Sequence, residues 1–376
     1  MDKIRVYITG YNTVSALGYG VDHSFGNLLK RKKNISFPNE QERLRQPYFA
    51  INYEAIKFNP FKSKVADLSV LLVDSMKDRI VKGTDLFVGT STGGIDDTEN
   101  NYKALLQGTS TYSIHKNHFF NVISDSIKEY FDGLIGSVYT ISTACSSSAQ
   151  ALLYAYKLMK AGVIKRAVVL GVDILSNTTK AGFDSLKLVS YTGTKPLSED
   201  RDGLNLGEGA GIMVLDIEPD GVPLCEVLGG ASTTDGHHMS SPDPEGIFQS
   251  QAIEDALLRS GVDKSRVGYV SAHGTGTEMN DRVETLSVKK FFGKNIIFSS
   301  LKGFVGHTLG ASALCELPLV VESLKKGVIV QPEDFKSPID KDIVPESEVN
   351  VDTDVFVKNS FGFGGNNVSL VFKIFK

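Results

Sequence analysis

Short hydrophobic runs alternate with alanine-rich and glycine-rich stretches along the whole chain. The runs have the length and composition of buried strands, and the stretches between them have the composition of helices. Strands are expected at 4–9, 85–89, 137–143, 166–171 and 211–216, and then at 224–228, 268–273, 295–300, 355–359 and 367–372. This alternation predicts an α/β fold in which helices cover both faces of the sheets.

The same succession of strands and helices occurs twice, which indicates two copies of one motif packed together. We expect the boundary near 217–222, so that an N-terminal half spans 1–217 and a C-terminal half spans 218–376. Two polar segments, 37–67 and 97–120, follow neither pattern. We expect them to be irregular and to cover the entrance to a binding site.

A single cysteine lies between a strand-like and a helix-like stretch, in the run Ile141-Ser-Thr-Ala-Cys145-Ser-Ser-Ser-Ala-Gln150. A thiol at such a corner lies at the N-terminus of the next helix, where unpaired N–H groups lower its pKa and expose it for attack. We therefore interpret Cys145 as a nucleophile. The alternative is a small buried hydrophobic residue, because free cysteines are usually buried.

Two histidines follow strand-like runs in the second half. His273 lies in Ser271-Ala-His-Gly-Thr-Gly-Thr277, and His307 lies in Gly306-His-Thr-Leu-Gly-Ala-Ser-Ala313. Either histidine alone is more typical of a structural residue that bonds a nearby carbonyl group. All three groups, however, lie at comparable points of strand–loop–helix units, where open α/β sheets place their chemistry. We expect them to form one site.

At these residues the chain resembles β-ketoacyl-acyl carrier protein synthases of the I/II type, condensing enzymes of the thiolase superfamily with a Cys-His-His active site. The resemblance runs nearly end to end. Thiolases are less similar because the loop 362–365 lacks their second cysteine, and initiation synthases have asparagine in place of His307. The matching motifs also include Asp202-Gly-Leu-Asn-Leu-Gly-Glu-Gly-Ala-Gly211, Asp281, Glu284, Lys302, Glu316 and Asn359-Ser-Phe-Gly-Phe-Gly-Gly365.

The resemblance implies a five-layered α-β-α-β-α thiolase fold, a dimer, and decarboxylative Claisen condensation of a Cys145-bound acyl chain with malonyl carrier. The N–H groups of Cys145 and Phe363 would hold the tetrahedral oxyanion, and two neutral imidazoles would donate to the enolate. Lys302, paired with Glu316, would hold His307. The resemblance further assigns substrate contacts to Thr275, Thr277, Thr92, Phe183 and Phe361, and loop-anchoring roles to Asp281 and Glu284.

The partner implied by the resemblance is a small acidic acyl carrier protein whose phosphopantetheine arm enters the site; no bound cofactor or metal is expected. Candidate docking residues are Lys62, Lys64 and Lys187. Asp67 and Leu68 stand where further basic residues are expected, which is a departure from the usual docking patch. The small polar Thr92 would admit longer, unsaturated or aryl-bearing chains.

Composition narrows the functional classes. A net charge of −4 and a pI near 6.0 argue against nucleic acid as the main partner, and no apolar run reaches the about 18 residues of a membrane span. The chain begins on a strand pattern, so we expect no signal peptide and a cytoplasmic protein. Three cysteines suit a reducing compartment, with Cys225 and Cys315 as packing residues. His115, His118, His237 and His238 lack metal-site spacing and are interpreted as loop histidines.

Three functions remain open. The first is an elongating β-ketoacyl synthase in fatty-acid synthesis or in polyene or polyketide assembly, working as a homodimer. The second is the catalytic half of a heterodimer whose partner sets chain length. The third is a non-catalytic interaction subunit, against which the intact Cys145, His273 and His307 argue.

Overall fold

The computed structural model describes residues 4–38, 43–57, 63–110 and 116–376. All ten expected strands are present in it. The strands are β1 (Val6–Ser15), β2 (Gly18–Tyr19), β3 (Thr84–Gly89), β4 (Ile135–Ile141), β5 (Arg166–Asp173), β6 (Gly209–Asp216), β7 (Cys225–Thr234), β8 (Val267–Ser271), β9 (Ile297–Ser299), β10 (Val328–Ile329), β11 (Val349–Asn350), β12 (Val355–Gly362) and β13 (Asn366–Ile374). The helices are α1 (Val21–Leu29), α2 (Lys64–Asp74), α3 (Ile95–Leu106), α4 (Asn121–Tyr130), α5 (Ser147–Lys160), α6 (Asn177–Ser185), α7 (Ile247–Ser260), α8 (Glu278–Phe292), α9 (Lys302–Val305) and α10 (Ser312–Lys326).

The two halves repeat one strand order. From outer edge to seam, the first half runs β4-β3-β5-β6-β1 and the second runs β9-β8-β12-β13-β7. In each half the outer three strands are parallel and the inner pairs are antiparallel. β1 and β7 then pair antiparallel, with Val6 opposite Val227 and Ile8 opposite Cys225, so the two sheets are continuous. The duplicated α/β fold is confirmed, while the division at residues 217 and 218 stays a prediction.

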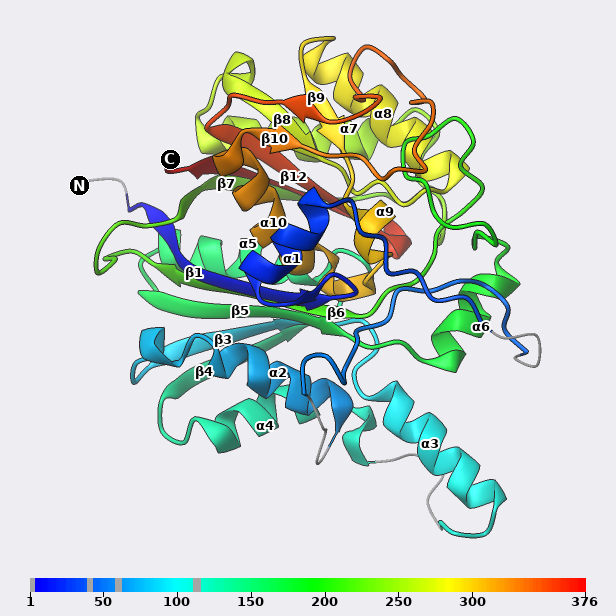
Figure 1. The fold of residues 1–376 in the computed structure, drawn as a ribbon. Helices are drawn as coiled ribbons and strands as arrows, with labels where there is room; N and C mark the ends of the chain where they lie inside the picture. The colour runs from blue at the N-terminus through cyan, green and yellow to red at the C-terminus, as the bar shows by residue number, and fades with distance from the viewer. Residues whose placement is uncertain (1–3, 39–42, 58–62, 111–115) are drawn as a thin grey trace.

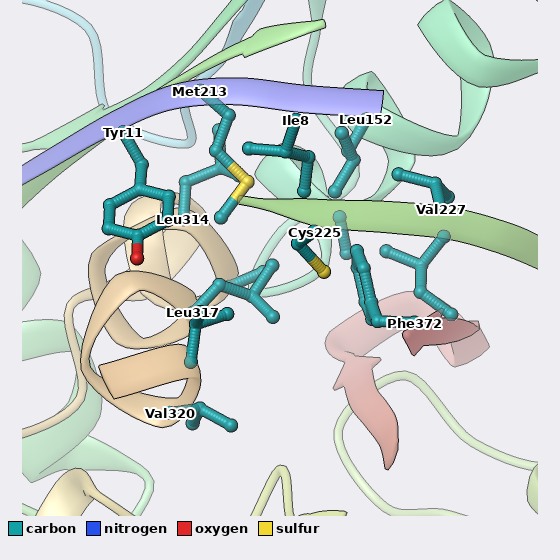
Figure 2. Close-up of a cluster of buried hydrophobic side chains, with 14 of the residues drawn as sticks. Ile8, Tyr11, Leu152, Met213, Cys225, Val227, Leu314, Leu317, Val320 and Phe372 are labelled. Atoms are coloured by element: carbon teal, nitrogen blue, oxygen red, sulfur yellow. The ribbon is translucent and has the colours of Figure 1, made fainter. Parts of the chain in front are cut away.

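Five layers follow from this arrangement (Figure 1). α2 and α4 cover the outer face of the first sheet, α5 and α10 fill the space between the sheets, and α7 and α8 cover the second sheet on its far side. The largest buried cluster lies around the central helices and contains Ile8, Leu152, Leu317 and Phe372. Figure 2 shows Cys225 among these side chains, which confirms its prediction as a packing residue.

Small residues allow α10 to approach β6 closely. A Cβ atom at Gly211 would lie 1.9 Å from the carbonyl oxygen of Leu314, and one at Gly207 would lie 2.2 Å from that of Val305. Gly207 therefore allows close packing against α9, and Gly211 against α10. Cys315, the other predicted packing cysteine, is buried on α10 against Thr13.

The segment 97–120 differs from its prediction. Most of its first part belongs to α3, which begins at Ile95 and ends at Leu106, so the expectation of an irregular segment is wrong there. The polar sequence of α3 hides the helix because none of its residues is fully buried. Among the described residues, none of the helices is long and apolar enough to span a membrane.

Candidate active site

Cys145 lies in the corner between β4 and α5. Ala144 adopts a left-handed backbone conformation with φ 51°, which a non-glycine residue holds only when its surroundings fix it. Here the fixing contacts come from hydroxyls: Ser147 and Ser91 both donate to the carbonyl oxygen of Ala144, at 2.6 and 2.9 Å. The predicted strand-to-helix corner is present, and serines hold it in its strained shape.

The thiol of Cys145 is buried, with 4% of the residue exposed. Burial raises its pKa to about 11, and the backbone N–H of Phe363 and the charge of Lys302 lower the pKa by less than burial raises it. The expected exposed thiol with a lowered pKa is therefore wrong for the unliganded chain, because desolvation outweighs the donors at the helix N-terminus. Cys145 is a protonated thiol at neutral pH.

His307 is held by backbone contacts on both sides. Its N–H donates to the carbonyl oxygen of Asn205 at 2.8 Å, and its carbonyl oxygen accepts from Gly207 at 3.0 Å. Its Nδ1 accepts the N–H of Leu309 at 3.2 Å and lies 3.2 Å from the hydroxyl of Ser312. An Nδ1 that accepts a backbone N–H leaves the ring proton on Nε2. The imidazole of His307 is thus fixed as an Nε2–H donor.

His273 lies on the loop after β8, and two buried carboxylates anchor this loop. Glu284 accepts the N–H groups of His273 and Gly274, both at 2.8 Å. Asp281 accepts the N–H of Thr275 at 2.9 Å and that of Leu197 at 2.7 Å. These contacts agree with the predicted anchoring roles. Within the described residues, Nδ1 of His273 is buried without a hydrogen-bond partner.

Cys145, His273 and His307 converge. The sulfur atom and one ring nitrogen of each histidine lie within 4.8 Å of one another, and the two imidazoles meet edge to face with centroids 5.4 Å apart. Burial, and then the charge of Lys302, lower the pKa of each histidine well below its usual value. Both rings are therefore neutral N–H donors at physiological pH. The same set has the donor types of a zinc site, although the nearby lysine charge opposes a cation.

A buried charge network supports the imidazoles. Lys302 donates to Glu316 Oε1 at 2.7 Å, as the sequence predicts. Lys358 on β12 also ion-pairs with Glu316, and sequence analysis missed it. A lysine within a strand has no local signal of burial, and 42 residues separate it from its carboxylate.

Phe363 faces the sulfur across a glycine-lined turn. Its backbone N–H lowers the pKa of the Cys145 thiol, as does the N–H of Cys145 itself, so both lie where they can donate to the sulfur. A Cβ atom at Gly362 would lie 2.9 Å from the carbonyl oxygen of Thr143, so only glycine allows this approach. The two predicted oxyanion donors therefore lie together beside the nucleophile.

A cavity of about 370 Å³ opens at these groups and leads to the surface. Of the predicted contact residues, it is lined by Thr275, Thr277, Phe183, Phe361 and Lys187, and also by Phe363. The rings of Phe183 and Phe363 stack with centroids 5.7 Å apart. Its lining mixes polar and apolar side chains, as a site for an acyl thioester with a long polar arm requires.

Two predicted residues that the structure describes do not line this cavity. Thr92 does not line this cavity, because its hydroxyl and N–H donate to the buried Asp173 at 2.8 and 2.9 Å. Lys64 lines a second, polar cavity beside α3, where it pairs with Glu208 at 3.9 Å. Lys62 lies outside the described residues. Of the two docking candidates within the described residues, Lys187 lines the cavity that contains Cys145 and Lys64 does not.

Asp173 is a further group that sequence analysis missed. It is fully buried at the end of β5 and accepts the hydroxyl of Thr90 at 2.8 Å and the N–H of Gly310 at 2.6 Å. It thereby joins the loop of Thr92 to the turn that follows His307. An aspartate at the carboxyl end of a buried strand is the one sequence signal that points to it.

Two family models match the chain. One, described as "Beta-ketoacyl synthase, N-terminal domain", matches residues 72–220, and one described as "Beta-ketoacyl synthase, C-terminal domain" matches residues 224–336. Together they cover more than half of the 376 residues. The first match contains the cysteine, and the second contains both histidines.

Individual proteins agree with this match over nearly the whole chain. The 3-oxoacyl-[acyl-carrier-protein] synthase 2 of Vibrio harveyi is 29% identical, over 99% of this chain and 99% of its own. A ketosynthase (ApeO) in complex with its chain length factor (ApeC) from Xenorhabdus doucetiae is 29% identical, with a TM-score of 0.88 over 99% of this chain and 98% of that one. A β-ketoacyl synthase from Burkholderia phymatum is 26% identical, with a TM-score of 0.84 over 99% of this chain and all of its own.

Proposed function

Because the chain belongs to the β-ketoacyl synthase family, we propose that it condenses an acyl chain held on Cys145 with malonyl-acyl carrier protein and lengthens the chain by two carbons. The convergence of a thiol with two neutral imidazoles supports this proposal. A thiol accepts the first acyl group, and two N–H donors stabilise the enolate that forms when the malonyl group loses carbon dioxide. No carboxylate base is needed.

The first half-reaction is acyl transfer. Cys145 gives its proton to His273, whose Nδ1 is unpartnered among the described residues and whose ring is therefore free to change tautomer. Sulfur then bonds to the acyl carbon, and the tetrahedral oxyanion is held by the N–H groups of Cys145 and Phe363. When the intermediate collapses, the bond to the pantetheine sulfur breaks, and that sulfur takes the proton from His273.

The second half-reaction forms the carbon–carbon bond. Malonyl carrier loses its carboxylate as carbon dioxide, and the enolate oxygen accepts N–H groups from His273 and His307. The α-carbon attacks the thioester on Cys145, and the bond to the sulfur of Cys145 breaks. The product is a β-ketoacyl carrier, and the thiolate recovers its proton from water or buffer.

The acyl carrier reaches Cys145 through its phosphopantetheine arm. The hydroxyls of Thr275 and Thr277 line the cavity, where we assign them to the amides of that arm. Lys187 is exposed where the cavity opens and matches the negative charge of an acidic carrier. We also assign the reaction to the cytoplasm, in agreement with three free cysteines.

The assembly proposed is a dimer through β4. This strand pairs with β3 on one side, has no strand partner among the described residues on the other, and exposes part of every residue. An unpaired edge of this kind is completed by a second chain. We propose first that two copies of this chain form the dimer. The similarity to a ketosynthase that was solved with its chain length factor favours, as the alternative, a partner paralogue that lacks the cysteine.

Intact-mass spectrometry tests the function directly. Wild type, Cys145→Ala and the control Cys225→Ala are incubated with an acyl carrier protein loaded with a medium-length chain, and malonyl carrier is then added. We expect wild type and Cys225→Ala to gain the acyl mass and to yield a β-keto product two carbons longer, while Cys145→Ala gains nothing. Acylation of Cys145→Ala, or no acylation of any protein across several carriers and chains, would refute the proposal.

A further inference from the structure

Lys358 lies buried on β12, at the point where this strand runs toward the oxyanion turn. Its Nζ has three acceptors: a carboxylate oxygen of Glu316, the carbonyl oxygen of Ala272 at 3.0 Å and the hydroxyl of Ser271 at 3.3 Å. An ammonium group has three N–H donors, whereas a neutral amine has two. The three acceptors therefore suit the charged form, while burial lowers the pKa of Lys358 below its usual value.

The network around Lys358 carries an excess positive charge. Two buried lysines, Lys302 and Lys358, share the single carboxylate of Glu316. Glu284 contributes a weaker attraction to Lys358, and burial raises the pKa of this carboxyl to about 7, so it is only partly ionised. The titratable and charged groups that face Lys358 are Glu316 from α10, Lys302 from α9, Glu284 from α8, Tyr269 from β8, and His273 and His307 from the loops after β8 and α9.

We propose that Lys358 is a second positioning lysine of the condensation site: it fixes the strand end that carries His273 and adds one net positive charge beside both imidazoles. This inference rests on the proposed function, because it assigns Lys358 to the decarboxylation and condensation step. The fixing contact is direct, since the acceptor carbonyl belongs to Ala272, the residue before His273.

The added charge acts on the histidines at a distance. Lys302 and Lys358 both oppose protonation of His273 and of His307. A neutral imidazole donates one N–H to the enolate and does not attract the malonyl carboxylate as an ion pair, so the carboxylate is free to leave. A positive charge outside the two rings also stabilises the negative enolate that forms between them.

Stability alone does not account for Lys358. Without it, Lys302 and Glu316 would form one balanced buried pair, whereas with it the network holds an unbalanced buried charge, which is costly. Costly buried charges concentrate at functional sites, where the strain or charge takes part in the chemistry. The Lys358→Met variant removes this unbalanced charge and keeps the buried pair of Lys302 and Glu316.

Histidine titration tests the inference without any activity measurement. The proteins are wild type, Lys358→Met, Lys358→Gln and the control Lys289→Met, which removes a half-exposed lysine paired with Asp340 and Asp342. With ¹⁵N-labelled histidine, NMR follows the ring nitrogens of His273 and His307 against pH. We expect both pKa values to rise by about one unit in both Lys358 variants and to stay unchanged in the control. Unchanged values in both Lys358 variants would overturn the proposal.

The two half-reactions are then measured separately. Acylation of Cys145 is expected to stay within about threefold of wild type in Lys358→Gln, while kcat for condensation falls about tenfold or more and its acidic limb moves to higher pH. An equal loss in both steps with an unmoved pH profile would show a structural role only and would refute the proposal, as would failure of both variants to fold. If wild type itself does not condense, the proposed function fails, and the titration still decides whether Lys358 sets the histidine pKa values.

Discussion

Replacing Glu316 with glutamine is the sharpest test of the buried network. The carboxylate is fully buried and holds Lys302 through one oxygen and Lys358 through the other. Glu316→Gln keeps the shape of the side chain but removes the negative charge that the two ammonium groups share. One substitution therefore leaves two buried cations with a single amide oxygen between them.

The expected loss in the free energy of unfolding can be estimated in two independent ways. Removing one partner of a buried ion pair destabilises proteins by about 3–5 kcal/mol. A buried lysine without a carboxylate partner can instead become neutral by losing its proton. Lowering a lysine pKa from about 10.4 to about 7 costs about 4.6 kcal/mol at about 1.36 kcal/mol per unit. Both estimates give a loss of about 3–5 kcal/mol in the free energy of unfolding for Glu316→Gln. This is a large share of the about 5–15 kcal/mol by which a typical domain is stable.

The assay is urea unfolding followed by far-ultraviolet circular dichroism at several pH values. A lysine whose pKa is lowered in the folded variant binds fewer protons folded than unfolded between that pKa and about 10.4, so stability rises with pH across this window. The deficit of Glu316→Gln should therefore shrink between pH 7 and pH 10. Adding Lys358→Met removes one stranded cation and should recover part of the loss at pH 7.

The control is Glu322→Gln, on the same helix but partly exposed and paired with Lys325; glutamine keeps an oxygen that can accept the hydroxyl of Tyr11. Exposed pairs contribute about 1 kcal/mol or less, so this variant should change little. A loss below about 1 kcal/mol for Glu316→Gln, or a deficit that does not change with pH, would contradict the account of two stranded cations.

Three further results are expected. Alkylation of Cys145 by iodoacetamide should accelerate about tenfold per pH unit between pH 7 and 10, because burial raises its pKa to about 11 and only the thiolate reacts; a rate that levels off below pH 8 in peptide mass mapping would contradict this. Thr92→Ile loses the hydrogen bond to Asp173 at a position that does not line the cavity, so kcat/KM should fall by a similar factor for short and for long or rigid acyl primers, and a loss confined to long primers would assign Thr92 to chain selection. Lys187→Glu should raise KM for the acyl carrier about tenfold at low salt without changing the alkylation rate of Cys145, and an unchanged KM would place docking elsewhere.

The hydrophobic pattern predicts every principal strand but not every boundary. β7 is expected at 224–228, yet it continues to Thr234 through Gly229 and Gly230. These residues have the composition of a turn, but β13 pairs with them and Ser260 of α7 packs where a Cβ of Gly229 would lie. Pairing and close packing thus override local propensity, which a single sequence does not reveal.

The residues of the candidate site also fall into those that the sequence predicts and those that it does not. Motifs local in sequence predict Cys145, His273 and His307, because strand–loop–helix corners identify them one at a time. The sequence does not predict Lys358 and Asp173, because their partners are distant along the chain and neither residue lies in a recognisable motif. The expected pKa of Cys145 is wrong because the sequence shows the helix N-terminus beside the thiol but does not show how far the thiol is buried.

The pairing of β1 with β6 and β7, where the two sheets join, has a consequence for folding during synthesis. β1 is synthesised well before its neighbours β6 and β7, which are encoded about 200 residues later. At about 5–20 residues per second, β1 waits about 10–40 s for these two strands, and until then it is paired only with the short β2 at Val14 and Ser15. During this interval the backbone N–H and C=O groups of Val6–Ser15 are largely unpaired, which exposes the growing chain to aggregation until β6 and β7 arrive.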